Sequence, residues 1–264
     1  MTLATDPRAQ LVEQQKQHFE AISEQYFEDR QSPTHRLFQD LLWSHFLKNK
    51  DFLRRPNLRV LEPMCGFGHG REVLERHLNV PIHYQGFDYS EPLVARAREI
   101  HPEVDFSVQD VTRFEPDAPQ DLIVLLGGLH HVPDHAATVV SKLAPALPTG
   151  GSFISFEPTN NTIFHRWVRE GIYRRHDFFD EETERAFTVS ELNSFFLDNG
   201  FTIRDQMHAG LMAYILFCNP DCFPALNVGS STLVRSAFRV DKFFMRNFVG
   251  RLGSFATLTL YQKQ

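Results

Sequence analysis

The chain has 264 residues, of which 42% are hydrophobic and 23% are charged, as in ordinary folded proteins. Its 27 basic and 33 acidic residues give a net charge of −6, which disfavours ribosomal RNA, transfer RNA and anionic membranes as partners. The three cysteines form no Cys-x-x-Cys pair, so they encode neither a disulfide framework nor a zinc site and indicate a reducing cytoplasm.

No membrane-spanning segment is expected. The longest apolar stretches, Leu122 to Leu129 and Leu211 to Cys218, are far shorter than the roughly 18 residues that cross a bilayer. Residues 1–14 are polar and lack the apolar centre of a signal peptide, so we expect no export.

The N-terminal part, residues 1–57, is predicted to form two helices. Hydrophobic residues between Ala9 and Lys48 recur at spacings of three and four, which is the period of a helix with one buried face. Ser32-Pro33 interrupts this pattern and separates the two helices.

Residues 58–157 alternate between short apolar strands and helices. The predicted strands are 58–61, 82–87, 104–108, 121–126 and 152–157, and the fourth is apolar throughout, as in a strand buried on both faces. A helix is expected from about Arg71 to Leu78, and another follows His131 and continues through Leu147. This order predicts an α/β fold: a mostly parallel sheet with helices on both faces and ligands at the carboxyl ends of the strands.

The remainder completes the sheet and adds two insertions. Thr188 to Glu191 is a capping box that opens a helix, and two further strands are predicted over 201–206 and 255–261. The insertions, 158–187 and 208–253, follow the fifth and sixth strands and are expected to cap a substrate pocket. We interpret the whole chain as one domain.

Each insertion contains a cluster of similar side chains that can be interpreted in two ways. In the first, arginines from Arg166 to Arg175 alternate with aromatic residues, which suits either an acidic or aromatic substrate or a solvated helix face. In the second, Phe238, Phe243, Phe244 and Phe248 favour a helix packed on the sheet over a lipid-binding face.

The loop after the first strand contains Gly66, Gly68 and Gly70, with Glu62 at its entrance. A pyrophosphate-binding loop has the spacing Gly-x-Gly-x-x-Gly and no anion beside it, so this loop suits a nicotinamide dinucleotide poorly. A carboxylate attracts a cation, and S-adenosylmethionine carries both an ammonium and a sulfonium.

Two further acids end the next two strands. Asp88 is placed to accept hydrogen bonds from both ribose hydroxyls of a nucleoside. Asp110 is placed to accept from an adenine amino group, with Val111 and Phe87 as apolar walls. Each acid alone also fits the role of a helix cap.

These segments resemble the class I S-adenosylmethionine-dependent methyltransferases that act on small molecules. The resemblance is carried by Val60 to Gly70, Gly86 to Ser90, Gln109 to Val111, Asp121 to Val124 and Leu129 to Asp134, in the family's order. It implies a seven-stranded Rossmann-like sheet, a lid helix near Phe19 to Tyr26, and S-adenosylmethionine as cofactor. The cofactor-binding residues that it implies are Glu62, Cys65, Gly66, Gly68, Asp88, Tyr89, Asp110 and Val111.

One position departs from the family's pattern. Met64 stands where the family usually has glycine, so the loop is expected either to take a different path or to place Met64 beneath it.

Methyl transfer from a sulfonium is a direct displacement, so a catalytic base is optional. If the acceptor loses a proton, the candidate catalytic residues are His131, His130 and Tyr26, of which His131 is best placed, just past the fourth strand. No set of ligands has metal spacing, so no metal is predicted. A small, partly apolar metabolite is the expected substrate.

Two other functions stay open at this point. The first is a non-catalytic S-adenosylmethionine-binding or scaffold protein of the same fold. The second is a nicotinamide-dependent oxidoreductase, against which the glycine spacing and Glu62 both argue.

Overall fold

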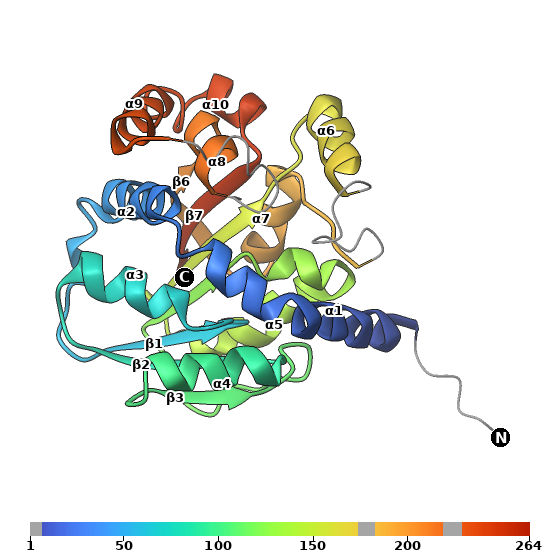
Figure 1. Ribbon diagram of the computed structural model, residues 1–264. Coiled ribbons are helices and arrows are strands. Elements are labelled where there is room, and N and C mark those ends of the chain that lie inside the picture. Colours follow the sequence, from blue (N-terminus) through green and yellow to red (C-terminus); the bar gives the residue numbers. More distant parts are fainter. Residues whose placement is uncertain (1–6, 174–182, 219–228) are drawn as a thin grey trace.

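The computed structural model describes residues 7–173, 183–218 and 229–264 and contains one seven-stranded sheet (Figure 1). The strand order is β3-β2-β1-β4-β5-β7-β6. The strands are β1 (Leu58–Pro63), β2 (Ile82–Asp88), β3 (Asp105–Val108), β4 (Leu122–Leu126), β5 (Ser152–Pro158), β6 (Phe201–Met207) and β7 (Ala256–Lys263). The strands β1 to β5 pair in parallel, while β7 is antiparallel to both β5 and β6. This architecture confirms the predicted fold.

Helices cover both faces of the sheet. They are α1 (Pro7–Asp29), α2 (Pro33–Leu47), α3 (His69–Leu78), α4 (Glu91–Ile100), α5 (Ala136–Leu143), α6 (Ile163–Tyr173), α7 (Val189–Leu197), α8 (Met212–Phe217), α9 (Ser231–Asp241) and α10 (Phe248–Gly253). In β4, Leu122 and Val124 join the core under α2, α3 and α4, whereas Ile123 and Leu125 join the core under α5 and α7. The fully apolar sequence of this strand follows from burial on both sides.

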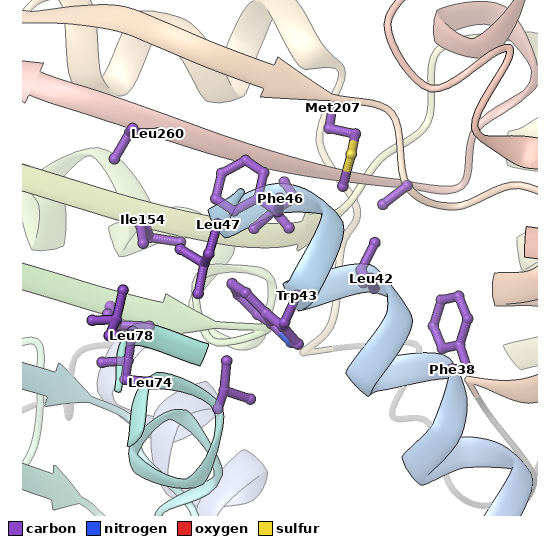
Figure 2. Packing of buried hydrophobic residues seen from close by; sticks show 14 of the residues in the cluster. Phe38, Leu42, Trp43, Phe46, Leu47, Leu74, Leu78, Ile154, Met207 and Leu260 are labelled. Carbon is purple, nitrogen blue, oxygen red and sulfur yellow. The ribbon is translucent and has the colours of Figure 1, made fainter. Parts of the chain in front are cut away.

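Helix α2 forms a large part of the first core. Ser32 caps its start by accepting a hydrogen bond from the His35 N–H, at the break that the sequence predicts. Most of its buried side chains recur at spacings of three and four residues and therefore lie on one face of the helix. Figure 2 shows Phe46 and Leu47 near the strand residue Ile154, whereas Phe38, farther along the helix, packs against Tyr214 and Phe238.

The single helix predicted after His131 is divided. Short 3-10 turns at Leu129–His131 and Pro133–His135 precede α5, and a third, Ala144–Ala146, follows it. Pro133 has no N–H to continue a helix, and the carboxylate of Glu157 holds the backbone N–H groups of Gly128 and Leu129 instead.

The phenylalanine cluster of the second insertion differs from the prediction that it packs on the sheet. Phe238 is buried, but Phe243 is 76% exposed and Phe248 is 70% exposed. These two lie after α9 has ended at Asp241, so the helical spacing in the sequence does not continue through them. Of the predicted basic cluster, Arg174 and Arg175 lie outside the described residues.

Candidate functional site

The loop from β1 to α3 turns through two glycines with left-handed backbone. Gly66 has φ +53° and Gly68 has φ +85°, a region that glycine enters without steric cost. The loop is fixed to the next strand by a hydrogen bond from the Cys65 N–H to the Phe87 carbonyl. The Cys65 side chain is buried close to Gly86, where a Cβ would approach its sulfur to 3.1 Å.

Met64 adopts the left-handed backbone that glycine usually supplies, with φ +55°. Its side chain packs against Gly128, where an added Cβ would lie 2.8 Å from the Met64 sulfur. The loop therefore keeps a glycine-like turn, and the Met64 side chain contacts the segment after β4 and lines the main cavity. A non-glycine residue in this backbone region costs about 1–3 kcal/mol.

Glu62 is buried at the end of β1 and turned under the loop. Its carboxylate accepts a hydrogen bond from the Gly70 N–H at 3.2 Å and another from the Tyr84 hydroxyl. Burial raises the pKa of Glu62 to about 8, although these two hydrogen bonds lower it. A cation bound beside this carboxylate would favour its charged form, which fits the cationic end of S-adenosylmethionine.

This raised pKa predicts a pH-dependent stability. The unfolded chain releases the Glu62 proton near pH 4.5 and the folded chain near pH 8. The contribution of this group to the free energy of unfolding is therefore complete below pH 4.5 and is lost as the pH rises toward 8. The Glu62→Gln variant cannot lose this proton, and its free energy of unfolding should rise relative to the wild type by up to about 1.4 kcal/mol per pH unit within that window. Urea unfolding of both proteins across the window measures the difference, and a difference independent of pH would contradict the assignment.

Asp88 ends β2 and lies opposite the glycine loop. One of its carboxylate oxygens accepts from the Gly66 N–H at 2.9 Å and the other from the Ser90 N–H at 2.9 Å. Burial raises the pKa of Asp88 above its usual value, while these amides oppose the shift. Each oxygen keeps a lone pair, so the carboxylate can still accept from a pair of ribose hydroxyls.

The remaining residues predicted to bind the cofactor divide into two groups. Tyr89 lies beside Asp88, lines the main cavity, and its buried hydroxyl has no hydrogen-bond partner among the described residues. Gly68, Asp110 and Val111 do not line that cavity. Asp110 instead accepts hydrogen bonds from the backbone and hydroxyl of Thr112, at 2.8 and 2.7 Å. An adenine-binding role for Asp110 stays a prediction.

His130 is tied to a buried carboxylate. Its Nδ1 lies 3.0 Å from an oxygen of Glu157, whose other oxygen accepts from the Gly128 and Leu129 N–H groups at 3.0 and 2.9 Å. Burial raises the pKa of Glu157 to about 7 and lowers that of His130 well below its ordinary value. This pair therefore shapes the turn after β4.

His131 contacts two residues that the sequence did not indicate. Its Nδ1 lies 2.9 Å from the Gln15 side-chain nitrogen and 3.4 Å from an oxygen of Glu184. The Gln15 amide also donates to Glu184 at 3.0 Å, and Thr183 donates to Gln15. Burial raises the pKa of Glu184, but His131 and these hydrogen bonds outweigh it and leave the pKa low. The carboxylate is therefore charged beside the imidazole.

Tyr26 belongs to α1, but its side chain lies outside the described residues. Helix α1 also carries Gln15, so it reaches across the strand ends to His131. A second contact fixes α1 near the glycine loop, where Phe27 meets Phe67 edge-on with ring centroids 5.1 Å apart.

One group of described residues has donor atoms close enough together to share a metal ion. Single donor atoms of His130, His131 and Glu184 lie within 4.8 Å of one another. The hydrogen bonds from Gln15 to His131 and Glu184 already account for part of this closeness. The expectation that the protein uses no metal stays a prediction.

These residues meet at one cavity of about 470 Å³ above the carboxyl ends of β1, β2 and β4. The predicted residues that line it are Glu62, Cys65, Gly66, Asp88, Tyr89, His130 and His131. The opposite wall comes from α2, α6, α8 and the end of β5 and is largely apolar, with Trp43, Phe156 and Tyr214. The cavity thus joins an acidic side under the glycine loop to an apolar side under the insertions, and its volume is typical of a small-molecule site.

Part of the chain is similar to known methyltransferases. Residues 60–151 match the family model described as a methyltransferase domain. A trans-aconitate 2-methyltransferase of Variovorax paradoxus is 31% identical over 112 residues, which cover 42% of this chain and 43% of that protein. The match therefore spans less than half the length of this curated relative.

Solved structures share the fold over a longer region. An S-adenosylmethionine-dependent methyltransferase of Mesorhizobium loti has a TM-score of 0.52 and 18% identity, covering 82% of this chain and 97% of its own. A cyclopropane synthase of Mycobacterium tuberculosis has a TM-score of 0.55 and 17% identity, covering 81% and 83%. At this identity the likeness establishes the fold.

Proposed function

We propose that the protein uses S-adenosylmethionine to transfer a methyl group to a small, partly apolar metabolite by direct displacement. The match of residues 60–151 to the methyltransferase-domain family model supports this proposal. The observation that carries this proposal is the single cavity in which buried acids face an apolar wall. The acids suit a cationic donor, and the apolar wall suits an acceptor that is not strongly polar.

The mechanism follows from the positions of the side chains. When bound, S-adenosylmethionine supplies an electrophilic methyl group on a sulfonium with a neutral leaving group. Asp88 would hold the ribose and Glu62 would face the amino-acid end, while α1 and the insertions exclude water from the acceptor side. Most of the rate enhancement would therefore come from orientation and water exclusion.

His131 is the group best placed to take a proton from the acceptor. It lines the cavity, and the charged Glu184 beside it stabilises the imidazolium that proton transfer would create. In contrast, the ring of His130 is bonded to Glu157 and serves the turn. Glu184 and Gln15 would act as positioning residues for His131.

We expect His131→Ala to lower kcat about 10²–10⁴-fold while S-adenosylmethionine binding changes little. Free imidazole should restore part of the activity, because the substitution leaves a space where the ring stood. Steady-state kinetics and calorimetry measure the two effects, with His135→Ala as the matched control outside the cavity. Unchanged kcat in His131→Ala would contradict the role of base and indicate an acceptor that keeps its proton.

The nature of the acceptor is inferred from the wall that faces the acids. Its polar groups include His35 and Gln39 of α2, and burial lowers the pKa of His35 to about 3, so this imidazole is neutral. Arg169 reaches the cavity but already donates to Asn160 and to the Phe255 carbonyl. Arg30 is the second arginine that lines the cavity, and most of the remaining wall is apolar, which suits a partly apolar acceptor better than a polycarboxylate such as trans-aconitate.

A methyl-transfer assay with labelled S-adenosylmethionine tests the proposal directly. The acceptor panel comprises trans-aconitate, monocarboxylates with alkyl or aromatic bodies, phenols and amines. Label in an apolar acceptor supports the proposal, whereas label in trans-aconitate alone would replace the apolar acceptor with that of the curated relatives. Tight cofactor binding with no transfer to any of them would favour the non-catalytic alternative.

We place this activity in a reducing cytoplasm. The two cysteines that the structure describes, Cys65 and Cys218, are both buried and form no disulfide with each other. Within the described residues, no helix is long and apolar enough to cross a membrane.

A further inference from the structure

The segment between α9 and α10, together with α10 itself, presents large apolar side chains to solvent. Phe243, Phe248 and Val249 are 76%, 70% and 60% exposed, and Leu252 is 42% exposed. In α10, Phe248 and Leu252 are four residues apart and lie on the same side of the helix. Side chains of this size gathered on one short segment generally mark an interaction surface.

This segment is held firmly to the body of the protein. Met245 is fully buried, and its carbonyl accepts a hydrogen bond from the His208 N–H at 2.7 Å. Asn247 caps α10 by accepting from the Gly250 N–H at 3.0 Å, and a Cβ at Gly250 would collide with the Phe244 carbonyl. The outward direction of Phe243 and Phe248 is therefore set by packing beneath them.

The same segment of the chain is rich in exposed basic residues. Five basic residues lie between positions 231 and 252, all of them exposed: Arg235, Arg239, Lys242, Arg246 and Arg251. Asp241 is the one acidic residue in that range, and it is buried and accepts hydrogen bonds from the Met212 and Ala213 N–H groups. Arg246 pairs with Asp205, while the other four form no salt bridge with a described residue. This region is basic in a chain whose net charge is −6.

Helix α6 extends the apolar surface. Its N-terminal residues Ile163, Phe164 and Trp167 are 89%, 62% and 71% exposed. A hydrogen bond links the segment just before α6 to α10, because the Asn161 amide donates to the Arg251 carbonyl at 2.9 Å. Figure 1 shows α6, α9 and α10 at the same end of the molecule, away from α3 and α4.

We propose that this basic and apolar face, formed by α6 and residues 231–252, docks the protein on an anionic lipid surface. Phenylalanine, tryptophan and leucine side chains enter the boundary between headgroups and acyl chains, and arginine and lysine bind the lipid phosphates. Attraction of this kind acts within about 10 Å at ordinary ionic strength, so the local charge decides it rather than the net charge of the chain. A second copy of the chain fits this face poorly, because a symmetric contact would bring its basic residues together.

The test uses the full chain and sedimentation with two kinds of vesicle, phosphatidylcholine alone and phosphatidylcholine mixed with phosphatidylglycerol. We expect binding to the mixed vesicles, weakened by added salt. Phe243→Ser and Phe248→Ser should each weaken it about tenfold. Val108→Ser is the control, because Val108 is 44% exposed on β3, at the edge of the sheet opposite to β6. Reversal of charge in Arg239→Glu and Lys242→Glu should also weaken binding, whereas Arg76→Glu on α3 should not.

The variants remain interpretable because each position is exposed, so unchanged thermal unfolding and cofactor binding can be verified first. Absence of binding to mixed vesicles would overturn the proposal, as would equal binding by Phe243→Ser, Phe248→Ser and the wild type. A dimer in analytical ultracentrifugation that both phenylalanine variants abolish, without vesicle binding, would assign the face to a second copy instead.

Discussion

Asp88→Ala is expected to weaken S-adenosylmethionine binding by at least about a hundredfold. The ribose hydroxyls would lose two hydrogen bonds to a charged acceptor, each of which contributes about 1.5–3 kcal/mol. The Gly66 and Ser90 N–H groups would also lose their common acceptor, so the loop under the cofactor would loosen. Calorimetric titration with S-adenosylmethionine and S-adenosylhomocysteine measures the loss, with nicotinamide adenine dinucleotide as the control ligand.

Two further variants test whether the loss of S-adenosylmethionine affinity is due to the Asp88 carboxylate. Asp88→Asn keeps one acceptor oxygen for the loop and should lose less affinity than alanine. Asp110→Ala removes a carboxylate that is engaged with Thr112 and does not line the cavity, so a much smaller loss is expected. Wild-type affinity in Asp88→Ala would refute the assignment of Asp88. Binding of the dinucleotide, with neither sulfur nucleoside bound, would support the oxidoreductase.

Gly70→Ala should destabilise the protein by about 3 kcal/mol and abolish cofactor binding. In most helices this change is stabilising by about 1 kcal/mol, since alanine is the better helix former. Here the added Cβ would lie 2.5 Å from the Glu62 carboxyl group, which must move and give up its bonds to the Gly70 N–H and the Tyr84 hydroxyl. Buried polar groups left without partners cost about 1–3 kcal/mol each.

Gly171→Ala in α6 is the matched control. Apart from its own helix backbone, no atom of the described residues lies within 4 Å of the position of its Cβ, so we expect the free energy of unfolding to rise by the usual amount, about 0.5–1 kcal/mol. Urea unfolding of both variants provides the comparison. A lower free energy of unfolding in Gly70→Ala together with a higher one in Gly171→Ala would support the contact with Glu62. A higher free energy of unfolding in both variants would show that the Glu62 carboxylate can move freely.

The sheet could be predicted from sequence because each strand carries a local signal. Ile123 and Val124 lie in a run that is apolar on both faces, and Thr188 with Glu191 forms the capping box that opens α7. The phenylalanines after Asp241 gave a misleading signal. Their spacing resembles a helix, but α9 ends before them and Met245 alone provides the buried anchor. Spacing does not report where a helix stops.

Only part of the candidate site could be predicted from the sequence. Glu62 and Asp88 stand at the ends of recognisable strands, so their meeting follows from the topology of a parallel sheet. Glu184 and Gln15 meet across 169 positions of the chain, and neither lies in a motif. Such contacts depend on how α1 crosses the strand ends, which no local pattern encodes. A glutamate just before the Thr188 capping box was the available signal, but many surface glutamates look the same.

The antiparallel position of β7 has a consequence for how the chain folds. Strand β6 pairs with β7 and with no other described strand, and the 48 residues from His208 to Phe255 separate the two. While the ribosome makes that stretch, β6 has no neighbour in the sheet and β5 has an open edge. Exposed strand edges of this kind invite association with other chains. The interval between synthesis of β6 and synthesis of β7 is therefore the one in which the edges of this sheet are most open to other chains.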